Sequence, residues 1–192
     1  MDNNELNLYL VVVGGRIPKA NIELHDVRWV IGSKIEDTFE DLRKDWFGSI
    51  DGLHIDSYKK IYSVDGYKIK IKKAQIKKSE INLTKKVKSI KQLWFINLGG
   101  YDPKSMQEKH EFGLVVASTG SEAKSIAKSK WLNGSLKKHN DDIDCLRRFS
   151  DVDDCKSIKT INNWEIELIP DATHFENSTF PDWYGYLRID KK

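Results

Sequence analysis

Cysteine is scarce in this chain of 192 residues, which contains Cys145 and Cys155 and no Cys-x-x-Cys pair. A disulfide framework or a cysteine-based zinc site needs several cysteines at defined spacings. We therefore expect both thiols to be reduced, as in a reducing compartment.

Long hydrophobic runs are absent as well. The apolar run nearest the start, Leu8–Val13, is too short to cross a membrane, and Asp2 and Glu5 precede it in place of basic residues. We expect neither a secretory signal nor a membrane span. The expected location is cytoplasmic, with no membrane as a partner.

Established ligand-binding motifs are missing too. Neither Gly14-Gly15 nor Gly99-Gly100 belongs to a G-x-G-x-x-G or P-loop pattern, and each pair leads to a proline and a loop. Phosphate binding at a glycine turn needs a helix directly after it, so we interpret both pairs as turns of positive φ. The aspartates within residues 141–154 lack the spacing and glycine of a calcium loop and are interpreted as a solvated insertion. The sequence implies no cofactor.

What the sequence does contain is an internal repeat. Aligned without a gap, residues 8–58 and 93–143 share 12 identities in 51 positions, where about 3 are expected from ordinary composition. The aligned pairs include His54 with His139. With 12 further residues inserted in the second copy, in or near residues 141–156, VDGYKIKI from Val64 aligns with INNWEIEL from Ile161. A duplicated module explains both alignments.

Each copy is predicted to form two strands, a helix and two more strands. Apolar runs precede the Gly-Gly pairs, apolar residues follow at helical spacing in 34–47 and 121–132, and a strand of period two closes each copy. Ser33 and Ser118 stand where they could cap the helices. Trp46 and Trp131 are predicted at equivalent buried positions.

These elements favour an α+β fold with two tandem β-β-α-β-β repeats, a mainly antiparallel sheet and the helices on one face. We place the first repeat at 1–75, a basic connector at 76–91, the second repeat at 92–170 and a C-terminal extension, with one more strand, at 171–192. The repeats are expected to pack as one globular unit.

Several segments resemble one known family. LHIDSYKKI and VDGYKIKI in the first copy, and NLGGYDPKSMQEKHEFGLVVAS with DVDD in the second, are similar to the bacterial domain-of-unknown-function family 1543, whose members carry one or two copies of this module. The second copy departs from the pattern where KKHNDDIDC replaces GLHIDSY. The resemblance covers about residues 8–170 and implies a repeat architecture but no activity.

Four of the five histidines belong to the repeat, and each has a carboxylate two residues away. On an extended strand this spacing places both side chains on one face, which suits a His–carboxylate hydrogen bond or two ligands of one metal ion. We favour a structural role, because an enzyme usually needs one active site and this pattern occurs in both halves. The candidate binding or metal residues are Glu23, His25, His54, Asp56, Glu108, His110, His139 and Asp141.

Charge is unevenly distributed along the chain. Residues 59–91 contain 12 lysines, no arginine and only Asp65 and Glu80 as acids, so this segment carries +10 while the whole chain carries +3. Such a segment is a candidate surface for nucleic acid or another polyanion. We favour pairing with the second copy instead, where glutamates align with lysines of the first. The candidate polyanion-binding residues are Lys68, Lys70, Lys72, Lys73, Lys77, Lys78, Lys85, Lys86 and Lys88.

The sequence therefore favours a non-catalytic binding or interaction protein, with another protein or a second copy of the chain as its partner. The alternative is a metal-dependent or acid–base enzyme of hydrolase type that uses the Glu/His and His/Asp pairs. Nucleic-acid or polyanion binding through the lysines is a second alternative and is not favoured. An enzyme is less expected than a binding protein because the sequence has no nucleophile–base pattern.

Overall fold

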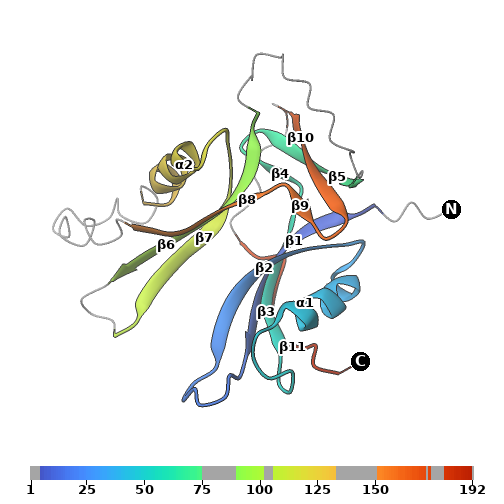
Figure 1. Ribbon diagram of the computed structural model, residues 1–192, viewed down its shortest axis with the longest axis vertical. Coiled ribbons are helices and arrows are strands. Elements are labelled where there is room, and N and C mark those ends of the chain that lie inside the picture. Colours follow the sequence, from blue (N-terminus) through green and yellow to red (C-terminus); the bar gives the residue numbers. More distant parts are fainter. Residues whose placement is uncertain are drawn as a thin grey trace, which may run out of the picture. The chain divides into compact units, whose positions relative to one another are not determined.

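The computed structural model describes residues 5–74, 90–101, 106–132, 151–171, 173 and 180–191. Strands dominate and helices are few, which confirms the α+β class (Figure 1). The strands are β1 (Asn7–Gly15), β2 (Leu24–Gly32), β3 (His54–Ile61), β4 (Ser63–Val64), β5 (Tyr67–Lys73), β6 (Gln92–Tyr101), β7 (Glu108–Ala117), β8 (Asp151–Ile158), β9 (Thr160–Ile161), β10 (Trp164–Pro170) and β11 (Trp183–Arg188). The helices are the 3₁₀ helix η1 (Ile35–Thr38), α1 (Phe39–Asp45) and α2 (Gly120–Leu132). Within these residues, no helix is long and apolar enough to cross a membrane.

The strands form three sheets rather than the single sheet that the sequence predicted. Their orders are β11-β3-β1-β2, β4-β5-β10-β9 and β7-β6-β8. The chain divides into two compact units, residues 1–74 with 161–192 and residues 75–160. The units differ from the predicted repeat boundaries because β10 pairs with β5 and β11 pairs with β3, which places both late strands in the first unit. Most of the predicted connector, residues 76–89, lies outside the described residues.

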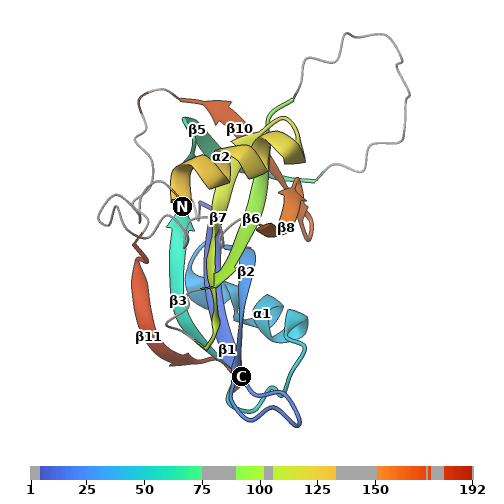
Figure 2. The ribbon, with the colours of Figure 1, turned by 90° about the vertical axis from the view of Figure 1, so that its left-hand side faces the viewer.

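The first unit is centred on β1, an apolar strand with β2 on one side and β3 on the other. Helices η1 and α1 lie against β2 (Figure 1), and β11 runs along β3 (Figure 2). The predicted extra strand in the tail is therefore confirmed. Ile189, just after β11, is 1% exposed, so the C-terminal segment is part of this core. The core residues are Tyr9, Val11, Val13, Val30, Ile35, Leu42, Trp46, Leu53, Ile55 and Ile189.

In the second unit, α2 packs on the three-stranded sheet β7-β6-β8 (Figure 2). Ala123 and Ala127 of α2 are fully buried against the sheet. The core residues are Ile96, Leu98, Val115, Ala117, Ala123 and Ala127.

The helix starts and the two tryptophans differ from the prediction. The Thr119 hydroxyl accepts the N–H of Glu122, while the Glu122 carboxylate accepts the N–H of Ser118, so Thr119 and not Ser118 caps α2. Trp46 follows α1 and is buried, with its ring above Gly15 of β1. Trp131 lies inside α2, is only partly buried, and packs against Gly113 of β7. The two tryptophans therefore do not occupy equivalent positions.

Ser33 is not a helix cap either. Its backbone N–H donates to the Asp37 carboxylate, as does that of Lys34, so an acid inside the 3₁₀ turn fixes the start of the helical segment. The predicted helix at 34–47 is divided, with η1 preceding a seven-residue α1.

The expected pairing of KIKI with EIEL is confirmed. Strands β5 and β10 are antiparallel neighbours, with Lys70 opposite Glu167 and Lys72 opposite Glu165. The Lys72 ammonium also lies 2.5 Å from Glu167 Oε1. Opposite charges on neighbouring strands explain much of the basic character of β5 without an external anion.

Lys72→Glu should lower the free energy of unfolding by about 1 kcal/mol at low salt, because it places three carboxylates together on one face of β5 and β10. The effect should shrink at high salt, where repulsion is screened. Lys73→Glu is the matched control, since Lys73 faces Trp164 instead. Chemical denaturation at two salt concentrations measures both. Adding Glu167→Lys to Lys72→Glu should restore stability, and failure of this rescue would refute the pairing.

Candidate metal centre

The Gly-Gly pairs are strand residues, so their interpretation as turns of positive φ is wrong. Gly14 and Gly15 complete β1, and none of the four glycines has a positive φ. Gly14 lies between His25 of β2 and His54 of β3. A Cβ atom at Gly14 would lie 2.7 Å from His54 Nε2 and 2.9 Å from His25 Cδ2. Glycine is required here by the close approach of two imidazoles.

Four predicted residues of the first copy meet at this position. The rings of His25 and His54 have centroids 6.4 Å apart and are nearly perpendicular. The Asp56 carboxylate lies between them, with Oδ2 3.1 Å from His25 Nε2 and Oδ1 3.3 Å from His54 Nε2. Glu23, just before β2, brings its two oxygens to 3.8 Å from His25 Nε2 and 3.9 Å from His54 Nε2. The structure thus joins a Glu-x-His and a His-x-Asp pair from two strands.

A β-bulge positions Asp56. Strand β1 pairs Val13 with Ile55 and Val12 with Ser57, so Asp56 is the extra residue of β3. Bulges re-aim side chains and are common beside functional sites. Here the re-aimed carboxylate reaches both imidazoles.

His54 is the buried member of the cluster. Its side chain is 1% exposed, whereas those of His25 and Glu23 are 48% and 44% exposed. His54 Nδ1 lies 2.8 Å from the Gly52 carbonyl oxygen. A carbonyl can only accept, so we assign a proton to Nδ1; in the neutral ring, Nε2 then carries a lone pair. This Nε2 is buried and has no hydrogen-bond partner among the described residues.

The Nε2 lone pair of His54 faces carboxylate oxygens of Asp56 and Glu23. Acceptor atoms in this arrangement repel one another, and an unsatisfied buried polar group costs about 1–3 kcal/mol. A cation held between the nitrogen and the oxygens would convert the repulsion into coordination. The arrangement therefore has the electrostatics of a cation site.

The distances suit a transition metal. The ligand atoms of Glu23, His25 and His54 all lie within 4.8 Å of one another. Ligands at 2.0–2.2 Å from a tetrahedral ion would be about 3.3–3.6 Å apart. The contacts of 3.1–3.9 Å around the two Nε2 atoms bracket this range. Two imidazoles with carboxylates are donors that suit Zn²⁺ and Fe²⁺.

Three residues of the site were missed by sequence reasoning. Gly14 provides the space for the rings, Gly52 holds Nδ1 of His54, and Tyr186 packs against the His54 ring with centroids 4.1 Å apart and planes tilted by 32°. Tyr186 comes from β11, which pairs with β3. Gly14 lies in the repeat and Gly52 opens the segment GLHIDSY, but neither was assigned to a site, and Tyr186 belongs to no motif.

The second copy lacks an equivalent cluster in the described part of the chain. Glu108 Oε2 lies 3.9 Å from His110 Nε2 on β7, while His139 and Asp141 lie outside the described residues. Gly99 is paired with His110 on one side and with Asp151 of β8 on the other. Asp151 therefore stands at the register position of His54, so the ungapped pairing of His54 with His139 is wrong.

The misalignment has a structural cause. Strand β8 begins at Asp151, so the inserted residues precede this strand and Asp151 and Asp154 belong to the strand itself. Asp151 and Asp154 are therefore not part of an insertion, while Asp141, Asp142 and Asp144 lie outside the described residues. No second group of three potential metal ligands occurs within the residues that the structure describes.

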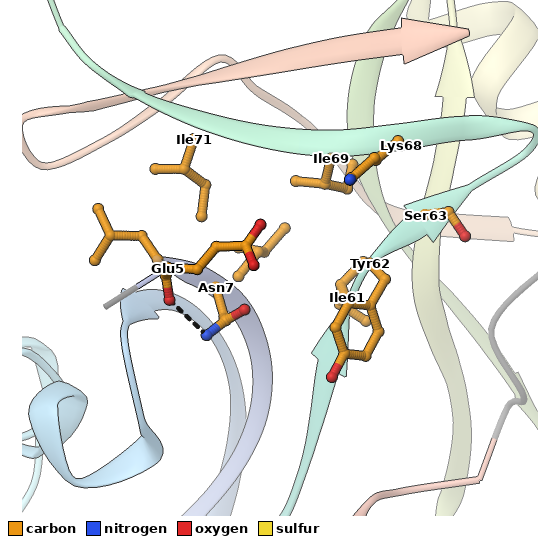
Figure 3. Close-up of a pocket in the computed structure, with 10 residues that line it drawn as sticks. Glu5, Asn7, Ile61, Tyr62, Ser63, Lys68, Ile69 and Ile71 are labelled. Atoms are coloured by element: carbon orange, nitrogen blue, oxygen red, sulfur yellow. Dashed lines mark hydrogen bonds between the residues drawn. The ribbon is translucent and has the colours of Figure 1, made fainter. Parts of the chain in front are cut away.

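Of the predicted polyanion-binding lysines, the structure places Lys68, Lys70, Lys72 and Lys73 on β5, and the other five lie outside the described residues. Lys68 lines a cavity of about 360 Å³ formed by the start of β1, the end of β3 and β5 (Figure 3). Its walls combine apolar side chains with polar ones, and Glu5 and Lys68 supply its charges. None of the candidate histidines or carboxylates lines this cavity.

Comparison with known proteins identifies the family. The model of the Domain of Unknown Function (DUF1543) matches residues 20–71 and 105–168. A crystal structure of a protein Il1583 from Idiomarina loihiensis is similar over 96% of this chain and 99% of that chain, with 32% sequence identity and a TM-score of 0.69. No curated protein matches. The chain belongs to the DUF1543 family, as the resemblance of its repeated segments predicted.

Proposed function

We propose that this protein binds one divalent transition-metal ion through Glu23, His25 and His54, with Asp56 as a further oxygen donor. The observation that carries the proposal is the buried Nε2 atom of His54, which has no hydrogen-bond partner in the described part of the chain and faces two carboxylates. Metal-binding histidines commonly donate their other ring N–H to a carbonyl, as His54 does to Gly52. Two carboxylates beside neutral imidazoles also match the charge of a divalent ion.

This proposal replaces the structural role that the sequence favoured. A hydrogen bond that anchors a loop requires donor and acceptor within about 3.2 Å. The 3.8 Å between Glu23 and His25 is too long, and both side chains are substantially exposed. Glu23 and His25 therefore contribute little as a mutual anchor, but they stand where exposed ligands of an ion would stand.

The test compares two pairs of the same residue types. Glu23→Gln with His25→Gln should abolish the binding of one equivalent of Co²⁺ or Zn²⁺, measured by titration calorimetry and by elemental analysis after dialysis. Glu108→Gln with His110→Gln should leave it unchanged, because the second copy has Asp151 at the register position of His54. If the wild-type protein binds no metal stoichiometrically at micromolar concentration, the proposal fails.

A metal-dependent hydrolase is the second candidate. The exposed side of the cluster supports it, because catalytic metal ions keep a coordination position open to water or substrate. We keep metal binding as the primary function, in a cytoplasmic protein, because the carrying observation concerns ligand atoms and says nothing of a substrate. Polyanion binding has less support, because Lys70 and Lys72 face glutamates of β10.

We infer further that the chain is a tandem duplication of a β-β-α-β-β unit. In support, β1 and β6 begin 85 positions apart, while β3 and β8, and β5 and β10, begin 97 positions apart. Asp65 and Asn162, also 97 positions apart, share a φ of 52°. On this view the first copy carries the buried imidazole, and the second carries a carboxylate at that register position.

A further inference from the structure

The C-terminal segment, residues 187–191, contacts the turn that holds His54. Asp190 Oδ2 accepts the backbone N–H of Gly52 at 2.9 Å, across 138 positions of sequence. The next residue toward β11, Ile189, donates its N–H to the Leu53 carbonyl at 2.9 Å. Both residues that directly precede His54 are therefore fixed by the end of the chain.

Gly52 connects this segment to the imidazole. Its N–H is held by Asp190, and its carbonyl accepts the Nδ1–H of His54. Gly52 has a φ of +82°, a conformation that few other residues adopt. The orientation of its carbonyl, and with it that of the His54 ring, therefore depends on how the Gly52 backbone is held.

Asp190 is well suited to hold it. Its side chain is 3% exposed and is paired with the Arg188 guanidinium. Hydrogen bonds from Arg188, and then from the Gly52 N–H, hold the pKa of Asp190 far below its usual range. A fixed negative charge thus holds the N–H of Gly52, in the same residue as the carbonyl that accepts the Nδ1–H of His54.

We propose that Asp190 is a positioning residue of the metal site, and that docking of residues 187–191 sets the metal affinity. The inference rests on the proposed metal binding. Outer residues that orient a ligating histidine typically change affinity by 10–100-fold when mutated. Asp190 would act through Gly52 and His54 without touching the ion.

A closely matched control exists at the other end of β11. Asp182 accepts the backbone N–H of Lys60 at 2.7 Å and pairs with the Lys59 ammonium at 3.3 Å. Like Asp190, it joins a carboxylate beside β11 to a backbone N–H and a basic side chain. Lys60 lies near the far end of β3 from His54, so this contact does not reach the site.

The experiment measures Co²⁺ affinity and the Co²⁺ absorption spectrum for Asp190→Asn and Asp182→Asn. Asp190→Asn should raise the Kd about tenfold or more and change the spectrum, because the imidazole is less well held. Asp182→Asn should change the Kd by less than about twofold and leave the spectrum unchanged, whatever its effect on thermal stability. A purely structural role of Asp190 would move melting temperature alone.

Two outcomes are distinguishable. If wild-type protein binds no Co²⁺, the proposed function fails. If it binds Co²⁺ and Asp190→Asn binds equally well with the same spectrum, only the positioning role is overturned. Should Asp190→Asn fail to fold, Arg188→Gln serves instead, because it keeps the carboxylate but removes its partner. A smaller loss of affinity is expected there, and an unchanged affinity would also overturn the inference.

Discussion

A His54→Gln variant is expected to lose metal binding by at least about 100-fold, beyond the usual effect of outer-shell residues. His54 is the buried member of the proposed site, and the Gly52 carbonyl accepts a hydrogen bond from its ring. Wild-type protein with metal at 100 times the Kd should be stabilised by about 2.7 kcal/mol, and the variant should gain nothing. Thermal unfolding with and without Zn²⁺, together with titration calorimetry, measures both effects.

Metal binding, and not the stability of the metal-free protein, separates the two roles considered for His54. His54→Gln loses the hydrogen bond to Gly52 in either case, so some destabilisation of the metal-free protein is expected. If the imidazole is a ligand, the variant should also lose Zn²⁺ binding, whereas an anchor alone would leave Zn²⁺ binding intact. His110→Gln is the control and should alter neither metal affinity nor metal-induced stabilisation. A destabilised metal-free variant with intact Zn²⁺ binding would contradict the assignment of His54 as a ligand.

Local spacing made part of the site predictable. Glu23 with His25, and His54 with Asp56, are each two residues apart, and an extended chain places such neighbours on one face. The repeat identified these pairs without any structural information. The alternation of lysine with isoleucine, and of glutamate with isoleucine and leucine, likewise predicted the pairing of β5 with β10. In both cases the spacing of residues within one strand was enough to assign side chains to a face.

The convergence of the pairs was not predictable, because it depends on register across β1. Gly14 must pair with His25 on one side and His54 on the other, and no property of a single strand specifies this. The Gly-Gly pair was interpreted as a turn because glycine after an apolar run usually marks one. Glycine is needed at position 14 because a side chain there would collide with two imidazole rings, and this crowding is visible only in three dimensions.

The second copy shows the same limit. Counting identities without a gap aligned His139 with His54, yet hydrogen-bond register places Asp151 there. A short insertion costs little free energy in a surface segment, but it shifts the alignment of every later residue. Sequence alignment alone therefore could not show whether the insertion lies before or after β8. The contribution of Asp190 depends on the docking of the chain end 138 positions from Gly52, which has no local sequence signature.

Gly14→Ala should eliminate the metal site without removing any ligand. Gly14 has an ordinary strand conformation, so alanine brings no backbone strain, and only space decides the outcome. The new methyl group would lie 2.7 Å from His54 Nε2, the atom that would bind the ion. His54 cannot yield easily, because its ring is buried, bonded to Gly52 and packed against Tyr186. We expect loss of Co²⁺ and Zn²⁺ binding, with about 1–3 kcal/mol of destabilisation from overpacking.

Gly15→Ala is the matched control, one residue along the same strand. Its methyl group would lie 2.9 Å from Cζ2 of the buried Trp46, a comparable clash that involves no proposed ligand. Chemical denaturation should therefore show similar destabilisation for both variants, whereas calorimetry should show that Gly15→Ala still binds one metal ion. If both variants lose metal binding equally, the loss results from general destabilisation of the fold and not from crowding at His54. Retention of wild-type affinity by Gly14→Ala would mean that Nε2 of His54 does not point at the ion, and the ligand assignment would fall.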